Sequence, residues 1–292
     1  MSKISIRFFN NVPVRAVWND DKSNWYFSVL DILSVIRNEP SYEKNRNYWK
    51  YLKAKLKKED SQLVSLTTQL KLTAKDGKKY LSDALDFDGV YMLTAEFPGK
   101  VSAEFLKWLN KNDETVDAKS KQKAYDLFDD SIMDSIEVGT VKGLQQIHSY
   151  LFSGLYPFAG QIRTINIAKG GFVFASAIYL GESLKAIEQM PDSTFDEIVK
   201  KYVEMNIAHP FMEGNGRSTR IWLDMMLKRS LKKCVDWSKI DKKDYLDAMK
   251  QSVADATWIK SLLSSALTEK ILDREMFMKG VDYSYYYEEV SD

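Results

Sequence analysis

The chain has 292 residues, and its 42 Lys and Arg residues balance 41 Asp and Glu residues to a formal net charge of +1. This length suits one large domain or two ordinary domains, and the near-zero net charge excludes a strong single-sign field as a general means of attracting partners. The single Cys234 excludes an internal disulfide and suits a reducing compartment, while the lack of a signal-like or transmembrane-length apolar run predicts a cytoplasmic protein without membrane contact.

The start of the chain carries strand-like patterns. Residues 4–9 and 12–18 alternate apolar and polar side chains around Asn10–Asn11, which predicts a β-hairpin. Residues 25–27 continue the strand pattern, and Ser28 is a typical N-cap for the helix that follows. Further along we expect helices over 29–37, 41–58, 85–95 and 102–110, strands or a loop over 63–72, and a hairpin turn at Asp76–Gly77.

A basic run lies in the second of these helices. It contains no acidic residue and seven basic ones, Lys44, Arg46, Lys50, Lys53, Lys55, Lys57 and Lys58. Such a run is either a nucleic-acid face or the solvated face of a surface helix. By itself the pattern favours the solvated face.

Three short segments of this region point to a partner. They are W-Y-F-S-V-L-D-I from Trp25, D-G-V-Y-M-L from Asp88 and A-E-F-L-K-W-L from Ala103. Together they resemble the N-terminal domain of phage antirepressor and Bro-type proteins, over about residues 4–110. The resemblance implies a small α+β domain and DNA as a partner.

A polar stretch over 111–123 has no apolar residue larger than Val, so we place a domain boundary near 112, between domains 1–112 and 113–292. Helices are expected over 125–136 and 140–152, and His148 lies mid-helix among apolar neighbours as a structural residue. Residues 162–167 and 172–174 flank Lys169, Gly170 and Gly171, which indicates another β-hairpin, with Phe172 at its exit.

The most informative segment reads H-P-F-M-E-G-N-G-R-S-T-R, from His209 to Arg220. A helical pattern over 195–208 precedes it, and Pro210 disfavours helix at His209, so this histidine should lie at a helix end facing a loop. Gly214, Asn215 and Gly216 then predict a tight turn. A second helix is expected over 217–232, followed by helices over 242–255 and 258–271.

A glycine turn at the start of a helix is an anion site, because the first N–H groups lack helical partners and the dipole end is positive. Arg217 and Arg220 share a helix face there and can bind phosphate oxygens. Glu213 could serve a Mg²⁺ that bridges phosphates, and His209 is a natural general base. The alternative is a plain helix–loop–helix with a surface charge cluster, which the combination of His, Glu and two Arg disfavours.

The segment resembles the signature of the Fic family, H-x-F-x-[D/E]-G-N-G-R-x-x-R, at every fixed position, and residues 147–174 resemble the lead-in and flap of the Fic core. The resemblance, from about Asp113 onward, implies a mainly α fold: a helical bundle with a β-hairpin flap. It implies transfer of AMP from ATP with Mg²⁺ to a hydroxyl of a target protein, the chain itself being one candidate target. Under it, His209 is catalytic, Glu213 binds the metal, and ATP contacts Lys169, Gly170, Gly171, Phe172, Gly214, Asn215, Gly216, Arg217 and Arg220.

The tail contains S-Y-Y-Y-E, from Ser284 to Glu288, which is similar to the inhibitory helix [S/T]-x-x-x-E-[G/N] of some Fic proteins, although Glu289 replaces the usual Gly or Asn. The resemblance implies that Glu288 pairs with Arg220 and blocks ATP. Ser265 to Glu269 fits the same spacing but is expected inside a helix. The alternative for the tail is a helix docked only for stability.

The sequence therefore predicts a protein adenylyltransferase inhibited by its own C-terminal helix. Two alternatives remain open: removal of AMP or transfer of another phosphate-linked group by the same residues, and a DNA-bound regulator that uses the site as a sensor. The sequence names neither the target protein nor the oligomeric state.

Overall fold

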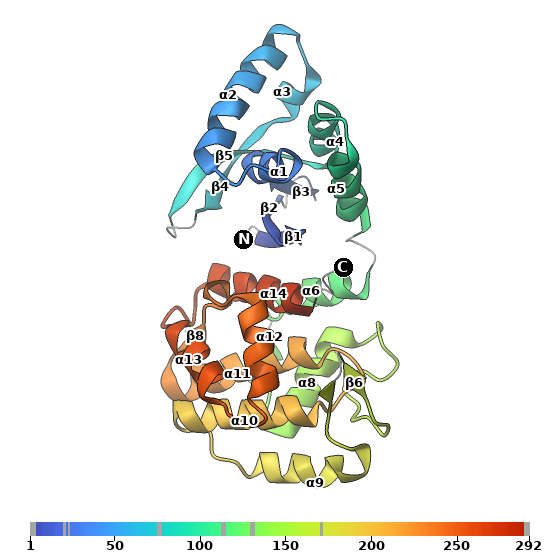
Figure 1. Ribbon diagram of the computed structural model, residues 1–292, viewed down its shortest axis with the longest axis vertical. Helices are drawn as coiled ribbons and strands as arrows, with labels where there is room; N and C mark the ends of the chain where they lie inside the picture. Colours follow the sequence, from blue (N-terminus) through green and yellow to red (C-terminus); the bar gives the residue numbers. More distant parts are fainter. Residues whose placement is uncertain are drawn as a thin grey trace. The chain divides into compact units, whose positions relative to one another are not determined.

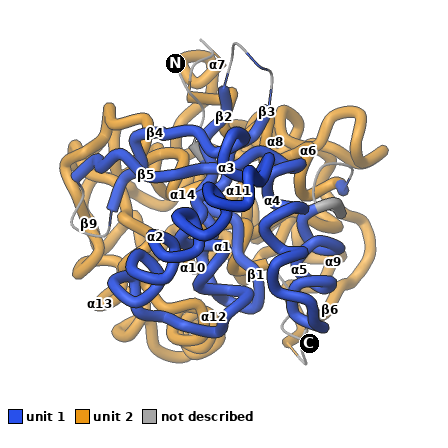
Figure 2. The backbone as a smooth tube through the Cα atoms, turned by 90° about the horizontal axis from the view of Figure 1, so that it is seen from above, with its two compact units in different colours: residues 1–115, 291 blue, residues 116–290, 292 orange. Residues whose placement is uncertain are grey.

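The protein was analysed as a computed structural model that describes residues 4–19, 22, 24–74, 78–111, 115–128, 132–169 and 172–288. The chain divides into two compact units between Thr115 and Val116, as the two colours of Figure 2 show. The domain boundary expected near residue 112 lies close to this division. Among the described residues, no helix has both the length and the apolar character needed to cross a bilayer.

Unit 1 is built on an antiparallel sheet (Figure 1). Asn10 and Asn11 both have positive φ, 47° and 65°, as a two-residue hairpin turn requires, so the first hairpin is confirmed. Asp76–Gly77 lies outside the described residues, but the strands on both sides of it pair. The sheet has the order β1 (Ile4–Phe9), β2 (Val12–Asn19), β3 (Asn24–Ser28), β5 (Lys79–Leu85) and β4 (Thr68–Thr73).

The helices of unit 1 close its core, in which Phe27, Leu33, Leu85 and Phe105 are fully buried. Ser28 caps the first helix as predicted, since its Oγ accepts from the Asp31 N–H. The segment expected to be strands or a loop over 63–72 instead begins with a short helix. The helices are α1 (Val29–Ile36), α2 (Tyr42–Lys58), α3 (Gln62–Leu66), α4 (Phe87–Ala95) and α5 (Lys100–Lys111).

Unit 2 is helical, and α11 (Asn215–Leu231) is its central element, packed against α8 (Val141–Phe152), α10 (Phe195–Ala208) and α14 (Arg274–Glu288). Trp222 of α11 is fully buried. The remaining helices are α6 (Val116–Asp126), α7 (Ile132–Ser135), α9 (Ala177–Glu188), the 3₁₀ turn η1 (Trp237–Lys239), α12 (Lys242–Gln251) and α13 (Thr257–Ser265), and the strand pairs are β6 (Ala168–Lys169) with β7 (Phe172–Val173) and β8 (Cys234–Val235) with β9 (Leu267–Thr268).

The fold class is confirmed as mainly helical with a small α+β N-terminal part. Several boundaries in unit 2 were wrong. The polar stretch over 111–123, for which a domain boundary and no helix was expected, is largely α6, and the helix expected over 258–271 ends at Ser265, because Leu267 and Thr268 pair with β8. The strand expected over 162–167 is irregular, and α9 was not predicted.

Candidate active site

His209 ends α10 in the left-handed conformation, with φ 48°, and its N–H donates to Met205 O. The predicted helix end before Pro210 is therefore confirmed. The His209 ring stacks on Phe174 with centroids 3.6 Å apart, and its Nδ1 lies 3.2 Å from Asn206 O. A carbonyl oxygen only accepts, so Nδ1 carries the proton and Nε2 keeps a lone pair, as a general base requires.

Arg163 holds this loop in place and was missed by the sequence analysis. Its side chain is buried, and its guanidinium donates to the backbone oxygens of His209 at 2.8 Å, Ala208 at 3.0 Å, Ile165 at 2.7 Å and Ala175 at 2.5 Å. Burial lowers the pKa of Arg163 below its ordinary value. No sequence signal singled it out, because its four acceptors are backbone carbonyl groups.

The turn after His209 is shaped by two close contacts. Gly214 has φ 81° and is the N-cap of α11, and a side chain there would strike the ring of Phe152. Asn215 is buried, and its amide exchanges two hydrogen bonds with the backbone of Phe211, at 2.8 and 2.7 Å. The side chain of Asn215 thus braces the turn, and its contact with ATP stays a prediction.

His148 supports the same turn from α8, which agrees with its expected structural role. Its Nδ1 accepts from the Gly160 N–H at 2.8 Å, and its Nε2 lies 2.9 Å from Glu213 O. The ring also stacks on Phe211 at 3.8 Å. Burial lowers the pKa of His148 to about 4, so the ring is neutral at physiological pH.

Arg220 is buried and fully engaged by α14 and α12. Its Nε donates to Ser284 Oγ at 2.8 Å, and its Nη2 donates to Ser284 O and to Glu288 Oε1, both at 2.7 Å. Nη1 lies 3.3 Å from the Tyr245 hydroxyl. Burial alone would lower the pKa of Arg220, but the negative field of Tyr245 and Glu288 raises it.

The carboxylate of Glu288 also lies against the first turn of α11. A Cβ added to Gly216 would overlap Glu288 Oε1. The N–H groups at a helix start favour an anion, and the Glu288 carboxylate lies beside them. The structure thus brings Ser284 and Glu288 to Arg220, as expected from the resemblance of the tail, and also places Glu288 against Gly216, which was not expected. Glu289 lies outside the described residues.

Arg217 is buried and lies between two carboxylates. Its Nη1 bonds to Asp117 of α6, and its Nη2 lies 3.1 Å from Glu213 Oε1. The rings of Phe152 and Tyr285 lie 4.9 and 5.5 Å from the guanidinium carbon. Asp117 was not identified from the sequence, because it lies in the polar stretch over 111–123, where no helix was expected.

Glu213 is the one carboxylate of the signature, and half of its side chain surface is exposed. Within the described ranges, no group of three or more His, Cys, Asp or Glu residues could hold a metal ion. A single carboxylate beside an anion turn fits Mg²⁺, which takes its other ligands from phosphates and water.

The hairpin expected as a flap is present as β6 and β7, which pair through Ala168–Val173 and Lys169–Phe172. Phe172 contacts Phe174 edge to face at 5.0 Å, and Phe174 is the residue that stacks on His209. Gly170 and Gly171 lie outside the described residues, and only the backbone of Lys169 is described.

Comparison with known proteins shows what this site is similar to. The chain is 27% identical over 147 residues to the protein adenylyltransferase VbhT of Bartonella schoenbuchensis, covering 46% of this chain and 30% of that protein. It is 31% identical over 118 residues to a probable protein adenylyltransferase, y4lH, of Sinorhizobium fredii, covering 36% of this chain and 61% of that protein. The chain thus spans less than two thirds of the length of both relatives.

Among solved structures, the BepC protein of Bartonella tribocorum with bound AMPPNP aligns with 19% identity and a TM-score of 0.47, over 55% of this chain and 87% of that one. A family model also matches part of the chain, and the matched segment contains the signature together with α8, the flap and α10. Residues 139–227 match the model of the Fic/DOC family, and protein adenylyltransferases are among the relatives of the chain at modest identity.

Proposed function

We propose that the chain is a protein adenylyltransferase that transfers AMP from ATP to a Ser, Thr or Tyr hydroxyl of a target protein. One observation carries the proposal. A single loop connects the His209 imidazole to the start of α11, where an anion would bind. The names of the relatives support the same reaction.

In the reaction, the incoming hydroxyl gives its proton to Nε2 of His209 while its oxygen attacks the α-phosphorus of ATP. The bond from the α-phosphorus to the bridging oxygen breaks, and pyrophosphate leaves. The backbone N–H groups at Gly214–Gly216 stabilise the charge on the α-phosphate, and Arg220 and Arg217 hold the outer phosphates. Mg²⁺, when bound beside Glu213, neutralises phosphate charge.

The proposal includes inhibition by α14. ATP needs the donors of Arg220, which Ser284 and Glu288 engage, and the anion place beside Gly216, where the Glu288 carboxylate lies. The Arg220–Glu288 ion pair is nearly dry, with the two side chains 3% and 19% exposed. A charge-assisted bond with little exposure to water competes well with a phosphate.

A second role is supported by one observation on unit 1. Arg46, Lys50, Lys57 and Lys58 are exposed on α2 and form no ion pair within the described part of the chain. We propose that this basic surface of α2 contacts the backbone of duplex DNA.

The adenylyltransferase proposal is tested by His209→Ala. We expect a loss of about 10²- to 10⁴-fold in AMP transfer, because the general base is gone, with ATP binding retained because His209 contacts no phosphate in the proposed reaction. The rate is measured by incorporation of label from α-labelled ATP into lysate proteins, and binding by calorimetry. Near-normal transfer by the variant would reject His209 as the base.

A further inference from the structure

Arg217 has an ion-pair partner of its own, separate from the contact between Arg220 and Glu288. The guanidinium is 3% exposed, and Asp117 of α6 bonds to its Nη1, although the Asp117 side chain is 62% exposed. The Nε of Arg217 is buried without a hydrogen-bond partner. A signature arginine expected to bind phosphate is thus neutralised by an acid from outside the signature.

One face of α6 ties this contact to α14. Ser120 Oγ accepts from the Tyr285 hydroxyl at 3.0 Å, and Lys121 Nζ lies 2.7 Å from the buried carboxylate of Asp282. Tyr125 also donates to Asp282. Positions 117, 120, 121 and 125 recur at helical spacing and therefore share a face, so α6 and α14 dock as a pair.

We propose that Asp117 sets the affinity of the site for ATP by competing with an outer phosphate for Arg217. The inference rests on the proposed function, because it needs ATP as the competing anion. Two acids from outside the signature then oppose ATP, Glu288 at Arg220 and Asp117 at Arg217, and removing Glu288 alone leaves Asp117 on Arg217.

The two contacts differ in strength for a physical reason. Glu288 is largely withdrawn from water, whereas Asp117 is more than half exposed and is stabilised in solvent when it leaves. Ion pairs with an exposed partner contribute little net free energy. The effect of Asp117 is therefore a moderate change in ATP affinity, which becomes visible once Glu288 is removed.

The test compares Mg-ATP binding to Glu288→Gly with binding to Asp117→Asn/Glu288→Gly by calorimetry. We expect the Kd for ATP to fall about three- to tenfold in the double variant, in line with the modest strength of a half-exposed ion pair. The Kd for AMP should not change, since AMP lacks outer phosphates. Asp126→Asn/Glu288→Gly, with an acid removed from α6 at a position that contacts Gln122 instead, should bind ATP like Glu288→Gly.

An unchanged or higher Kd for ATP in the double variant overturns the inference, as does an equal gain for AMP. Melting curves check that α6 stays docked. If Asp117→Asn is unstable, Asp117→Ser removes the same charge with a side chain that suits a helix start. ATP binding by Glu288→Gly without a further gain rejects only the role of Asp117. Failure of Glu288→Gly to bind ATP at all rejects the proposed function and the inference together.

Discussion

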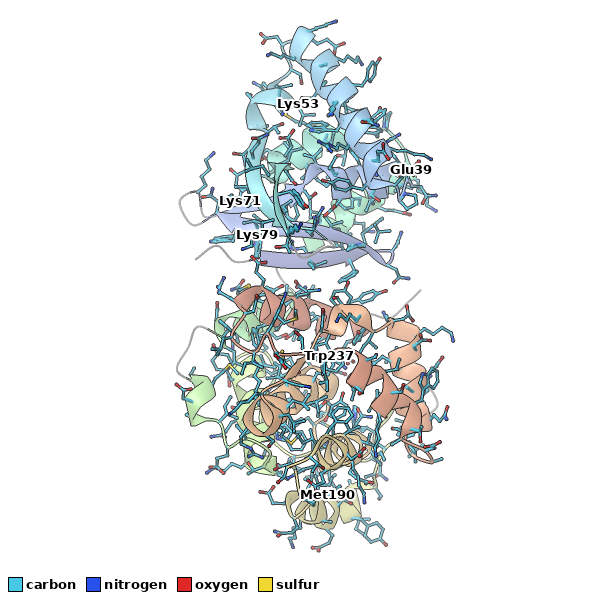
Figure 3. The ribbon with its side chains drawn as sticks, turned by 90° about the vertical axis from the view of Figure 1, so that its left-hand side faces the viewer. Glu39, Lys53, Lys71, Lys79, Met190 and Trp237 are labelled. Carbon is cyan, nitrogen blue, oxygen red and sulfur yellow. The ribbon has the colours of Figure 1, made fainter. Side chains whose placement is uncertain are left out.

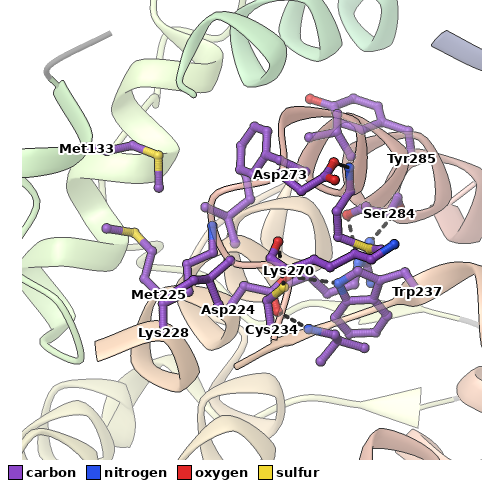
Figure 4. Close-up of a pocket in the computed structure, with 18 residues that line it drawn as sticks. Met133, Asp224, Met225, Lys228, Cys234, Trp237, Lys270, Asp273, Ser284 and Tyr285 are labelled. Atoms are coloured by element: carbon purple, nitrogen blue, oxygen red, sulfur yellow. Dashed lines mark hydrogen bonds between the residues drawn. The ribbon is translucent and has the colours of Figure 1, made fainter. Parts of the chain in front are cut away.

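Asp224 is a single buried residue that supports the segment on which α14 packs. It lies on α11, and its carboxylate accepts from the Val235 N–H at 2.8 Å and from Trp237 Nε1 at 3.0 Å (Figure 4). Trp237 O in turn accepts from the Tyr287 hydroxyl of α14 at 2.8 Å. One carboxylate thus fixes the turn on which the C-terminal helix rests.

Burial raises the pKa of Asp224 to about 6, although its two hydrogen bonds lower it in part. The folded pKa therefore lies above the unfolded value of about 3.9. Between these two values the folded state holds a proton that the unfolded state has lost. The stabilisation from this proton is present below the unfolded pKa and is lost as pH rises through the folded pKa.

We therefore expect Asp224→Asn to gain stability relative to the wild type between pH 4 and pH 7, by about 2–3 kcal/mol for a shift of roughly two pKa units. Any constant cost of the amide, which cannot accept both bonds with its oxygen and satisfy its NH₂ group, cancels in this comparison. Denaturant titrations at several pH values give the difference. A difference that is flat with pH would show that Asp224 is not protonated in the folded state.

At the scale of elements, α14 is the part whose removal should change activity most. Glu288 of α14 lies against the glycine turn and bonds to Arg220, while hydrogen bonds of Tyr287 and Tyr285 hold α14 to the rest of unit 2. Glu288→Gly leaves these tyrosine contacts in place and removes only the carboxylate. The helix therefore stays docked while the place of the phosphate opens.

We expect Glu288→Gly to raise AMP transfer at least about tenfold at subsaturating ATP, because an ion pair of about 1.4 kcal/mol or more no longer opposes binding. Label transfer from ATP is the measurement. The matched control is Glu269→Gly, which alters the other S-x-x-x-E match; Glu269 is exposed, beyond the end of α13. Equal rates for wild type and Glu288→Gly would leave α14 as a helix docked for stability alone.

Elements with strong local signals were predictable. Pro210 placed the end of α10, whereas the helix expected from Arg217 begins two residues earlier, at Asn215. The signal of Pro210 is local, so it can be read without knowledge of packing. The contact of Ser284 and Glu288 with Arg220 was expected only from the resemblance of the tail to an inhibitory helix.

What the sequence did not reveal depends on distant partners. The polar residues of α6 did not predict a helix, because Asp117, Ser120 and Lys121 have their partners in α11 and α14, far along the chain. Arg163 is informative only once the carbonyl groups around it are in place. Asn215 matched the family pattern, but its hydrogen bonds to Phe211 could not be read from the pattern.

At the scale of the whole molecule, the chain joins a proposed transferase unit to a unit with a basic helix. The structure divides the basic run of α2 into two classes. Lys53 pairs with Asp83 at 2.8 Å, Lys44 with Glu39 at 3.2 Å and Lys55 with Glu59 at 3.9 Å. Figure 3 labels Lys53 and Glu39 among the side chains of unit 1. The paired lysines are poor choices for a test, because replacing Lys53 would also leave Asp83 without its cation.

The remaining cations give a sharper test of DNA binding. We expect replacement of Arg46, Lys50, Lys57 and Lys58 by Glu to weaken retention of duplex DNA at low salt at least about tenfold and to flatten its salt dependence, because each lost phosphate contact removes about one released counterion. AMP transfer should not change, since these residues belong to unit 1. The matched control replaces four exposed lysines of unit 2 that also form no ion pair within the described residues, Lys200, Lys239, Lys250 and Lys270. Band shifts of one duplex over a salt series measure all three proteins; an equal loss in both variants would indicate only general charge attraction, and no retention by the wild type would make α2 a solvated face.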